Sequence, residues 1–239
     1  MRKNGPEIPD APPPQFEGFT DGTFKFLRGL KKNNNKAWFE AHRSDYEETL
    51  RNPSKALVEA MAAQFRDLDL PFVASVKSSL FRINRDIRFS NDKSPYKTHI
   101  GLSFQLDGTS KESWSGLYLG FEPAGGSKMH VFLGGGIYQP MAEQLKNIRA
   151  KIALEYQTLE KLLADKAFQR EFPKGLTGES LKRMPRGYAE DHPAADFLKM
   201  KQFLFGNDLD SDALLDEDLP KILGKKFKVA TPIARFLGE

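Results

Sequence analysis

The sequence predicts an α+β fold in which one antiparallel sheet, at about residues 72–138, is covered by N-terminal and C-terminal helices. Apolar residues recur at helical spacing on both sides of this region. Within it, apolar residues alternate with polar residues or glycine, which is the pattern of a strand with one buried face. The turns between the alternating segments are short, and this favours antiparallel neighbours because parallel strands need long crossovers.

Length, charge and cysteine content limit the class of protein. The chain has 239 residues, which suits one large domain or two small ones, and we expect one α+β domain over residues 19–239. It has no cysteine, so disulfides, zinc–thiolate sites and cysteine nucleophiles are excluded. A net charge of +4 is too small by itself to indicate nucleic-acid binding, which needs a clustered basic patch. We see neither an apolar leader nor an apolar run of about 20 residues, so we expect a soluble, cytoplasmic protein without membrane contact.

The N-terminal part predicts a tail followed by three helices. Residues 1–18 contain the run Pro12-Pro13-Pro14 and few large apolar residues, so we expect a disordered tail. Thr20 is the expected N-cap of the first helix, and Asn33-Asn34-Asn35 ends it. A second helix follows, and a third opens after a break at Asn52-Pro53, because the residue before a proline disfavours helix.

The middle of the chain predicts the strands of the sheet. They are expected near residues 72–76, 80–89, 100–106, 114–122 and 129–133. On the strand near 114–122, Gly116 and Gly120 alternate with Tyr118 on the face away from the core. Glycine inside a strand marks the close approach of a ligand or of another backbone, and a helix packed on this face is the alternative.

The C-terminal part opens with a glycine-rich segment, Gly134-Gly135-Gly136, which we expect to end the sheet in a turn. A helix then starts near Pro140. Free N–H groups at a helix N-terminus favour an anion, although a purely structural turn is the alternative. Further helices are expected up to Pro173 and towards the C-terminus. Between them, residues 174–188 are irregular and basic, and either add cations to the same pocket or form a solvated connector.

The stretch Leu80–Gly101 holds the densest group of hydrogen-bond donors and ionisable side chains in the chain. Its alternation predicts a strand that presents Arg82, Asn84, Asp86 and Arg88 on one face, and the alternative is a strand that breaks into a turn near Arg85-Asp86. Residues 90–95 then form a turn, a usual place for binding groups. Arginine forks suit carboxylate or phosphate, so the stretch predicts an anion-binding site. The alternative is an Arg–Asp–Asn network that only holds the loop in place.

Candidate residues follow from this hypothesis. The ligand-binding set is Arg82, Arg85, Arg88, Ser90, Lys93, Tyr96, Lys97, Gly135 and Tyr138. If the site is catalytic, Asp86, Asp92 and His99 are the expected acid–base groups, because carboxylates and imidazole transfer protons near neutral pH. The sequence predicts no metal ligands, and it leaves a cofactor and the oligomeric state undetermined.

Several motifs resemble a known family. The longest, F-R-I-N-R-D-I-R-F-S-N-D-K-S-P-Y-K-T-H, begins at Phe81. Others are N-x-K-x-W-F ending at Phe39, G-G-G-x-Y-x-P from Gly134, and L-K-R-x-P-x-G-Y from Leu181. Over about residues 19–237 the chain is similar to a conserved-hypothetical family of bacteria and fungi, a domain of unknown function. The resemblance implies one α+β domain and a shared polar site, and it brings no established activity.

Three classes of function remain open. The first is a module that binds an anionic small molecule bearing phosphate or carboxylate. The second is a hydrolase-type enzyme at the same place, although no G-x-S-x-G or H-E-x-x-H motif identifies a nucleophile or a metal. The third, ranked last, is a nucleic-acid binder that tracks phosphates with the basic loop and stacks Tyr96 or Phe89 on bases.

Overall fold

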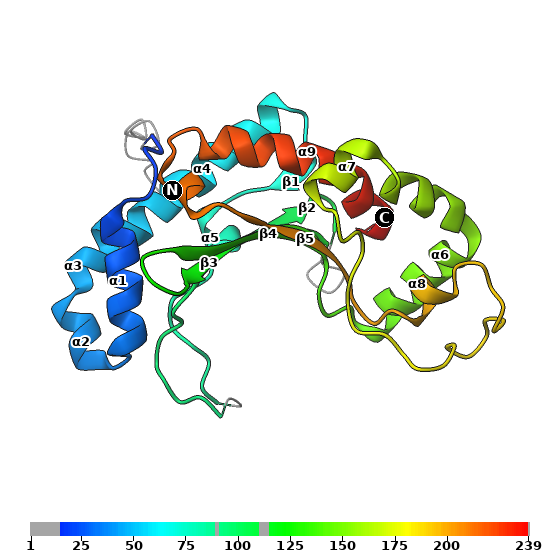
Figure 1. Ribbon diagram of the computed structural model, residues 1–239, viewed down its shortest axis with the longest axis horizontal. Coiled ribbons are helices and arrows are strands. Elements are labelled where there is room, and N and C mark those ends of the chain that lie inside the picture. Colours follow the sequence, from blue (N-terminus) through cyan, green and yellow to red (C-terminus); the bar gives the residue numbers. More distant parts are fainter. Residues whose placement is uncertain (1–14, 89–90, 110–114, 239) are drawn as a thin grey trace, which may run out of the picture.

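The computed structural model describes residues 15–88, 91–109 and 115–238 (Figure 1). Five strands form one antiparallel sheet in sequence order. They are β1 (Phe72–Val73), β2 (Ile100–Leu106), β3 (Gly116–Pro123), β4 (Met129–Ile137) and β5 (Phe203–Leu209). Helices from both ends of the chain pack against it, so the predicted single α+β domain with an antiparallel sheet is confirmed.

Helices before the sheet are α1 (Asp21–Lys32), α2 (Lys36–Ala41), α3 (Arg43–Asp45), the π-helix η1 (Tyr46–Arg51), α4 (Asn52–Asp67) and the short α5 (Val76–Ser79). Thr20 precedes α1 and Asn33 follows it, as predicted. The predicted break at Asn52-Pro53 is wrong, because η1 continues directly into α4. Proline lacks the N–H that would bond the carbonyl four residues earlier, that of Thr49. The buried Thr23 hydroxyl of α1 donates to this carbonyl instead, which offsets the loss.

Helices after the sheet's central strands are α6 (Ala142–Leu163), α7 (Lys166–Glu171), α8 (Ala195–Lys199), the 3-10 helix η2 (Ser211–Leu215) and α9 (Leu219–Gly238). Helices α4 and α9 lie over the same face of the sheet (Figure 1). In the part of the chain that the structure describes, no helix combines the length and the apolar character needed to cross a membrane.

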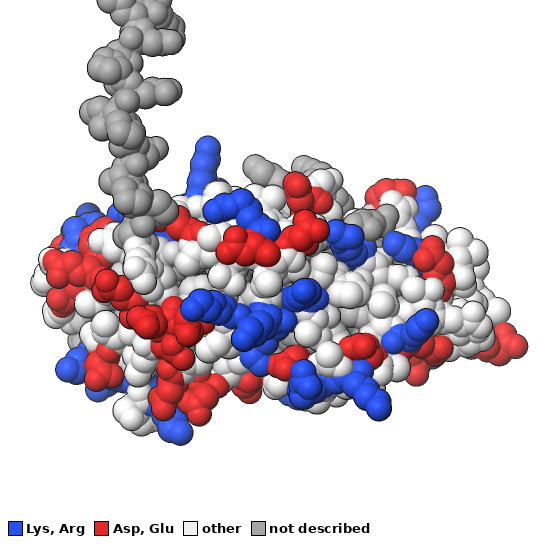
Figure 2. Space-filling model, turned by 90° about the horizontal axis from the view of Figure 1, so that it is seen from above, with Lys and Arg blue, Asp and Glu red and all other residues white. Residues whose placement is uncertain are grey.

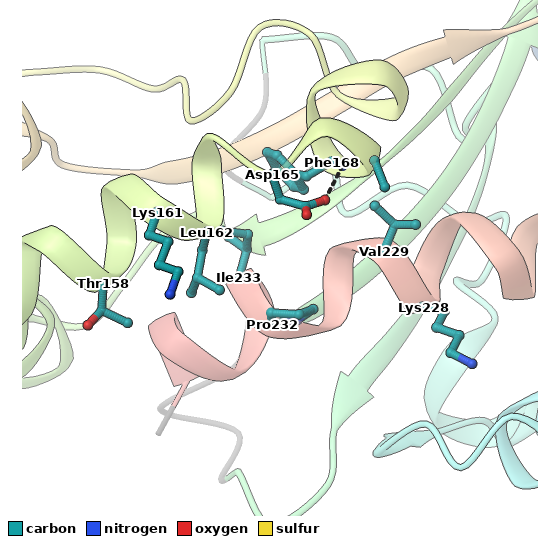
Figure 3. Close-up of a pocket in the computed structure, with 10 residues that line it drawn as sticks. Thr158, Lys161, Leu162, Asp165, Phe168, Lys228, Val229, Pro232 and Ile233 are labelled. Atoms are coloured by element: carbon teal, nitrogen blue, oxygen red, sulfur yellow. Dashed lines mark hydrogen bonds between the residues drawn. The ribbon is translucent and has the colours of Figure 1, made fainter.

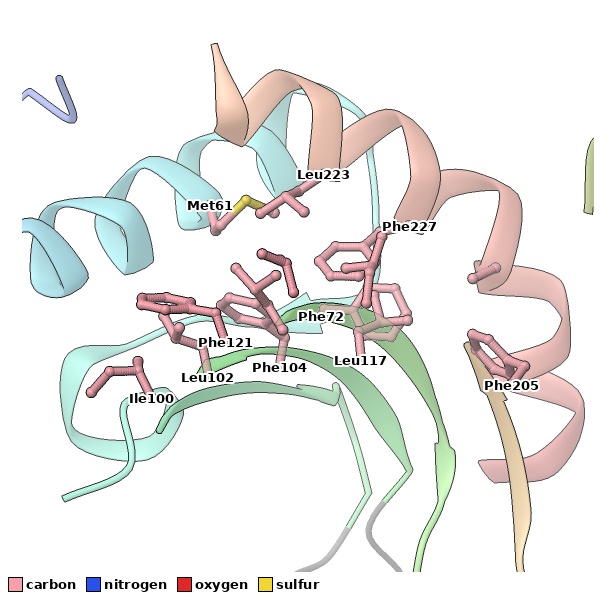
Figure 4. Close-up of a cluster of buried hydrophobic side chains, with 14 of the residues drawn as sticks. Met61, Phe72, Ile100, Leu102, Phe104, Leu117, Phe121, Phe205, Leu223 and Phe227 are labelled. Atoms are coloured by element: carbon pink, nitrogen blue, oxygen red, sulfur yellow. The ribbon is translucent and has the colours of Figure 1, made fainter. Parts of the chain in front are cut away.

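Aromatic side chains fill the layer between the sheet and helices α4 and α9 (Figure 4). Phe104 of β2 is fully buried and meets Phe65 of α4 at 5.3 Å and Phe227 of α9 at 5.9 Å, measured between ring centroids. Residues that pair directly across β2, β3 and β4 lie on the same side of the sheet. Leu119 and Leu133 form such a pair on the core-facing side. Alternate residues therefore point away from the helices, to the second face of the sheet.

Two predictions about the strands are wrong. Residues 80–89 do not form a regular strand, because their described part makes only the isolated bridges Leu80–Leu102 and Asn84–Tyr96. The described residues of this segment, 81–88 and 91–99, form the arms of an irregular hairpin that projects beyond the sheet (Figure 1). The fifth strand, β5, lies outside the predicted range of 72–138.

The sequence predicts a turn at the glycine segment Gly134–Gly136, and this prediction is wrong. The segment lies inside β4. It pairs on one side with β3, where Gly135 faces Leu117, and on the other with β5, where Gly135 faces Phe205. A side chain would not fit, because a Cβ on Gly135 would lie 2.7 Å from the Phe205 ring. Gly136 also has φ +105°, a conformation that glycine adopts without strain.

Most of the expected tail lies outside the described residues, which begin at residue 15. Within the rest of it, Phe16 is buried, and its ring packs edge-on against Phe19 with centroids 5.6 Å apart. Phe19 in turn contacts Phe121 of β3. The packed part of the chain therefore begins before residue 19.

Candidate functional site

The hairpin that carries most of the candidate residues is held by a few backbone hydrogen bonds. Phe81 N–H donates to Gly101 O at 3.1 Å, Lys97 N–H to Ile83 O at 2.8 Å, and Arg85 N–H to Pro95 O at 2.9 Å. The two arms are therefore paired from the sheet as far as Arg85. Residues 86–88 and 91–94 lie beyond this pairing, at the tip.

Tyr96 anchors the hairpin to the N-terminal helices. Its buried ring stacks on Phe39 of α2 with centroids 4.1 Å apart. The Asn34 side chain donates to Tyr96 O at 2.9 Å and accepts from Tyr96 N–H at 3.1 Å. The ring is thus occupied inside the protein, so the predicted ligand-binding role of Tyr96 is replaced by a structural one.

At the tip, most predicted groups already have partners within the loop. The Arg88 guanidinium donates to both carboxylate oxygens of Asp86, at 3.0 and 2.7 Å. Lys93 donates to Ile87 O at 2.9 Å. This matches the alternative of a network that holds the loop. Ser90 lies outside the described residues.

Asp86 and Asp92 are poor candidates for a general base. The hydrogen bond from the Arg88 side chain lowers the pKa of Asp86. Hydrogen bonds from the Ser94 side chain and backbone lower the pKa of Asp92, and Arg85, at 2.9 Å, contributes less. A carboxylate with a lowered pKa is a weaker proton acceptor at neutral pH, so neither geometry supports a catalytic role.

Near the sheet, the hairpin gathers positive charge. Arg82 and Arg85 on one arm are close enough to Lys97 on the other to lower its pKa, although burial is the larger cause. Neither Arg82 nor Lys97 forms an ion pair with another described residue. The Arg85 Nε atom is buried and has no hydrogen-bond partner among the described residues. We call Arg82, Arg85 and Lys97 the cation cluster.

His99 ends the second arm beside the cation cluster. Its half-buried position lowers its pKa, the charge of Lys97 lowers it further, and Glu122 of β3 opposes the shift. The imidazole is therefore neutral at pH 7 and can accept or donate a hydrogen bond. Unlike the two aspartates, His99 lies where the hairpin meets the sheet.

The second face of the sheet carries aromatic rings that the sequence did not assign to the site. Phe81 of the hairpin, Tyr118 of β3 and Phe132 of β4 form a row, with 6.3 Å between the centroids of each neighbouring pair. All three are partly exposed, Phe81 at 43%. Lys97 Nζ lies 5.4 Å from the centre of the Phe81 ring, which joins the row to the cation cluster. We call Phe81, Tyr118 and Phe132 the aromatic row.

Glycines under the aromatic row explain the alternation seen on β3. A Cβ on Gly120 would lie 2.5 Å from the Tyr118 hydroxyl, and one on Gly206 would lie 2.2 Å from Cζ of Phe132. The rings thus lie over the glycine backbone. The close neighbour of Gly120 is therefore an aromatic side chain, and neither a ligand nor a helix is needed to explain it.

Gly135 and Tyr138 are not beside the cation cluster. The hairpin joins β2 at Ile100, which pairs with Phe121. Gly135 pairs with Leu117, which lies four residues from Phe121 towards the start of β3. The position of Gly135 on the sheet faces the core. Tyr138 follows the end of β4 and is exposed. The expected convergence of the glycine segment with the arginines is therefore wrong.

A comparison with known families identifies the family of the chain. The model of the family described as "Conserved hypothetical protein (DUF2461)" matches residues 22–236. The chain belongs to this family. The match spans the hairpin, the whole sheet and both helical parts, so the resemblance inferred from the motifs is confirmed. Among curated proteins, none matches the chain.

Two acidic groups flank His130 of β4, Asp208 on β5 and Glu122 on β3. The His130 ring is 3.0 Å from Asp208 and 3.9 Å from Glu122, and all three side chains are exposed. Across the described residues, no group of three or more His, Asp or Glu is arranged to hold a metal ion. The face that carries α4 and α9 shows acidic and basic side chains intermixed (Figure 2), so it offers no field of a single sign.

A cavity of about 490 Å³ lies between α6, α7 and α9 (Figure 3). Its wall is largely apolar, with Leu162, Phe168 and Ile233, while Lys161 and Lys228 stand at its edge. Asp165 accepts from Phe168 N–H and so caps α7. None of the candidate residues from the sequence lies in this cavity.

Proposed function

We propose that the chain binds an anionic ligand, bearing phosphate or carboxylate, through Arg82, Arg85 and Lys97. The observation that supports this is the convergence of three cations from both arms of one hairpin, where Asp92 pairs with Arg85 and Asp86 lies near Arg82. Like charges held together repel each other, and an anion between them relieves that repulsion.

The shape of the ligand follows from the groups around the cation cluster. The buried Arg85 Nε atom is a donor without a partner among the described residues, and such a donor is costly to leave unbonded. Arginine presents a planar fork that matches two oxygens of one phosphate or carboxylate. His99 adds a neutral ring beside them. Only the base of the hairpin is part of this proposal, because Arg88 and Lys93 at the tip have partners of their own.

The hydrolase alternative receives less support. Both aspartates are held by loop donors that lower their pKa values, and His99 has no carboxylate close enough to form an ion pair among the described residues. A general base needs an accessible acceptor within reach of the reacting group. We therefore keep binding as the proposed function.

Titration with inorganic pyrophosphate and with succinate, followed by calorimetry, tests the proposal. Arg82→Gln and Lys97→Gln should each weaken binding about tenfold, since a charge-assisted hydrogen bond contributes about 1.5–3 kcal/mol and the cluster is partly exposed. Lys146→Gln is the matched control, because it removes one charge from the exposed surface of α6. Unchanged affinity in both cluster variants, or an equal loss in the control, would refute a specific site.

A further inference from the structure

We propose that the aromatic row binds the bases of single-stranded nucleic acid, while the cation cluster holds its phosphates. This inference rests on the proposed function, because the phosphates are then the anion. It adds the class of the ligand and a second set of contacts on the sheet.

The face that carries the row is left open by the helices. Helices α4 and α9 pack on the opposite side of the sheet (Figures 1 and 4). An antiparallel sheet with one wet face normally presents polar side chains there. This face carries Ser103, Gln105, Glu122, His130 and Asp208, but between them it presents Tyr118, Phe132 and a set of glycines, namely Gly101, Gly116, Gly120, Gly134, Gly136 and Gly206. The two rings lie close over glycine backbone, which suits the stacking of planar groups.

The rings are held in a position to stack. Tyr118 lies over Gly101 and Gly120, where added Cβ atoms would come within 2.9 and 2.5 Å of its hydroxyl. Phe132 lies over Gly206 in the same way. One side of each ring rests on the sheet backbone, and both side chains are partly exposed. Aromatic side chains in this position stack with nucleic-acid bases of any sequence.

The length of the row favours a strand over a single nucleotide. Centroids of neighbouring rings are 6.3 Å apart, from Phe81 through Tyr118 to Phe132, so the row crosses from the hairpin to β4. One base covers one ring, whereas consecutive unpaired bases can follow all three. A duplex hides the faces of its bases and cannot do this.

Charge along the row gives the strand an orientation. The cation cluster lies at the Phe81 end, where Lys97 Nζ approaches the ring. Asp208 lies at the Phe132 end, beside His130, whereas Glu122 of β3 is close enough to His99 to act on its pKa. Phosphates are attracted to the first end and repelled from the second, so the backbone of the strand should lie on the hairpin side. This charge complementarity favours a nucleic acid over an apolar peptide as the occupant.

Fluorescence anisotropy with a labelled 12-nucleotide thymidine strand tests the inference. Phe81→Leu and Tyr118→Leu should each weaken binding by at least about fivefold, the lower end of the range for loss of one stacked base. Phe81→Leu alters a side chain that is 43% exposed, so it provides a variant that should fold. Tyr138→Leu is the control, because it removes an exposed ring from the far end of the sheet and should leave affinity unchanged.

An abasic strand of equal length separates this inference from the proposed function. It carries the same charge without bases, and it should bind at least about fivefold more weakly than the thymidine strand. Equal binding of the two strands would overturn the stacking inference, while pyrophosphate binding would still support the anion site. Thymidine monophosphate that binds as tightly as the strand would also overturn it. Failure of both the strand and pyrophosphate to bind would refute both proposals.

Discussion

Asn34→Ala should release the hairpin from the N-terminal helices. The substitution removes two hydrogen bonds to the Tyr96 backbone, at 2.9 and 3.1 Å, across 62 positions of sequence. Each such bond contributes about 0.5–1.5 kcal/mol to stability, so we expect the free energy of unfolding to fall by about 1–3 kcal/mol. For a chain of this size, 1 kcal/mol corresponds to about 2–4 °C in Tm, which gives a decrease of about 2–12 °C.

Thermal unfolding followed by circular dichroism measures this loss, and amide hydrogen exchange locates it. Exchange should accelerate at Tyr96, whose N–H then has no acceptor, and at Lys97, which follows it in the hairpin. Asn33→Ala is the matched control, because its side chain only bonds Gly29 O at the exposed end of α1. An Asn34→Ala protein with the wild-type Tm and unchanged exchange at Tyr96 would show that the anchor does not depend on this amide.

Two further substitutions test the core and the pH response. Phe227→Ala should lower the unfolding free energy by about 3–5 kcal/mol in urea, because it empties a fully buried position beside Phe65 and Phe104; a loss below about 1 kcal/mol would contradict the packing. Burial lowers the pKa of His99 below 6.5, so the unfolded chain takes up a proton first as the pH falls. His99 thus contributes stability above pH 6.5 that is lost towards its folded pKa, and His99→Gln should flatten urea stability between about pH 7 and 5 relative to wild type.

The elements that the sequence predicted are those whose pattern is local. In β2 and β3, apolar residues alternate with glycine or polar residues, and the structure pairs them in that register. Helix α1 begins after Thr20 and ends before Asn33, both typical cap residues. The segment Gly134–Gly136 misled the prediction, because three consecutive glycines are typical of a turn. Glycine is needed at these positions because β4 packs closely against its neighbouring strands, and this is visible only in the structure.

The fifth strand and the aromatic row depend on contacts distant in sequence. Strand β5 contains Gly206, Asn207 and Asp208, which are poor strand formers, and its pairing with β4 overrides that preference. Tyr118 and Phe132 belong to different strands, and only the register places them together. The cation cluster was predicted because its members lie within one stretch. The sequence did not predict that the cation cluster is separate from the tip of the hairpin. Residue type alone does not show whether Arg88 binds a ligand or, as in the structure, pairs with Asp86.

The glycine-rich face imposes a cost that needs an explanation. Glycine in a strand is destabilising by about 0.5–1 kcal/mol relative to alanine, so the five glycines on this face other than Gly136 together cost about 2.5–5 kcal/mol. Packing of Tyr118 and Phe132 over four of them offsets part of this, yet both rings stay partly exposed. Polar side chains would cover the same backbone without leaving apolar rings in water. This surface agrees with the proposed stacking of planar bases, and the cation cluster at its edge agrees with the proposed negative charge of the ligand.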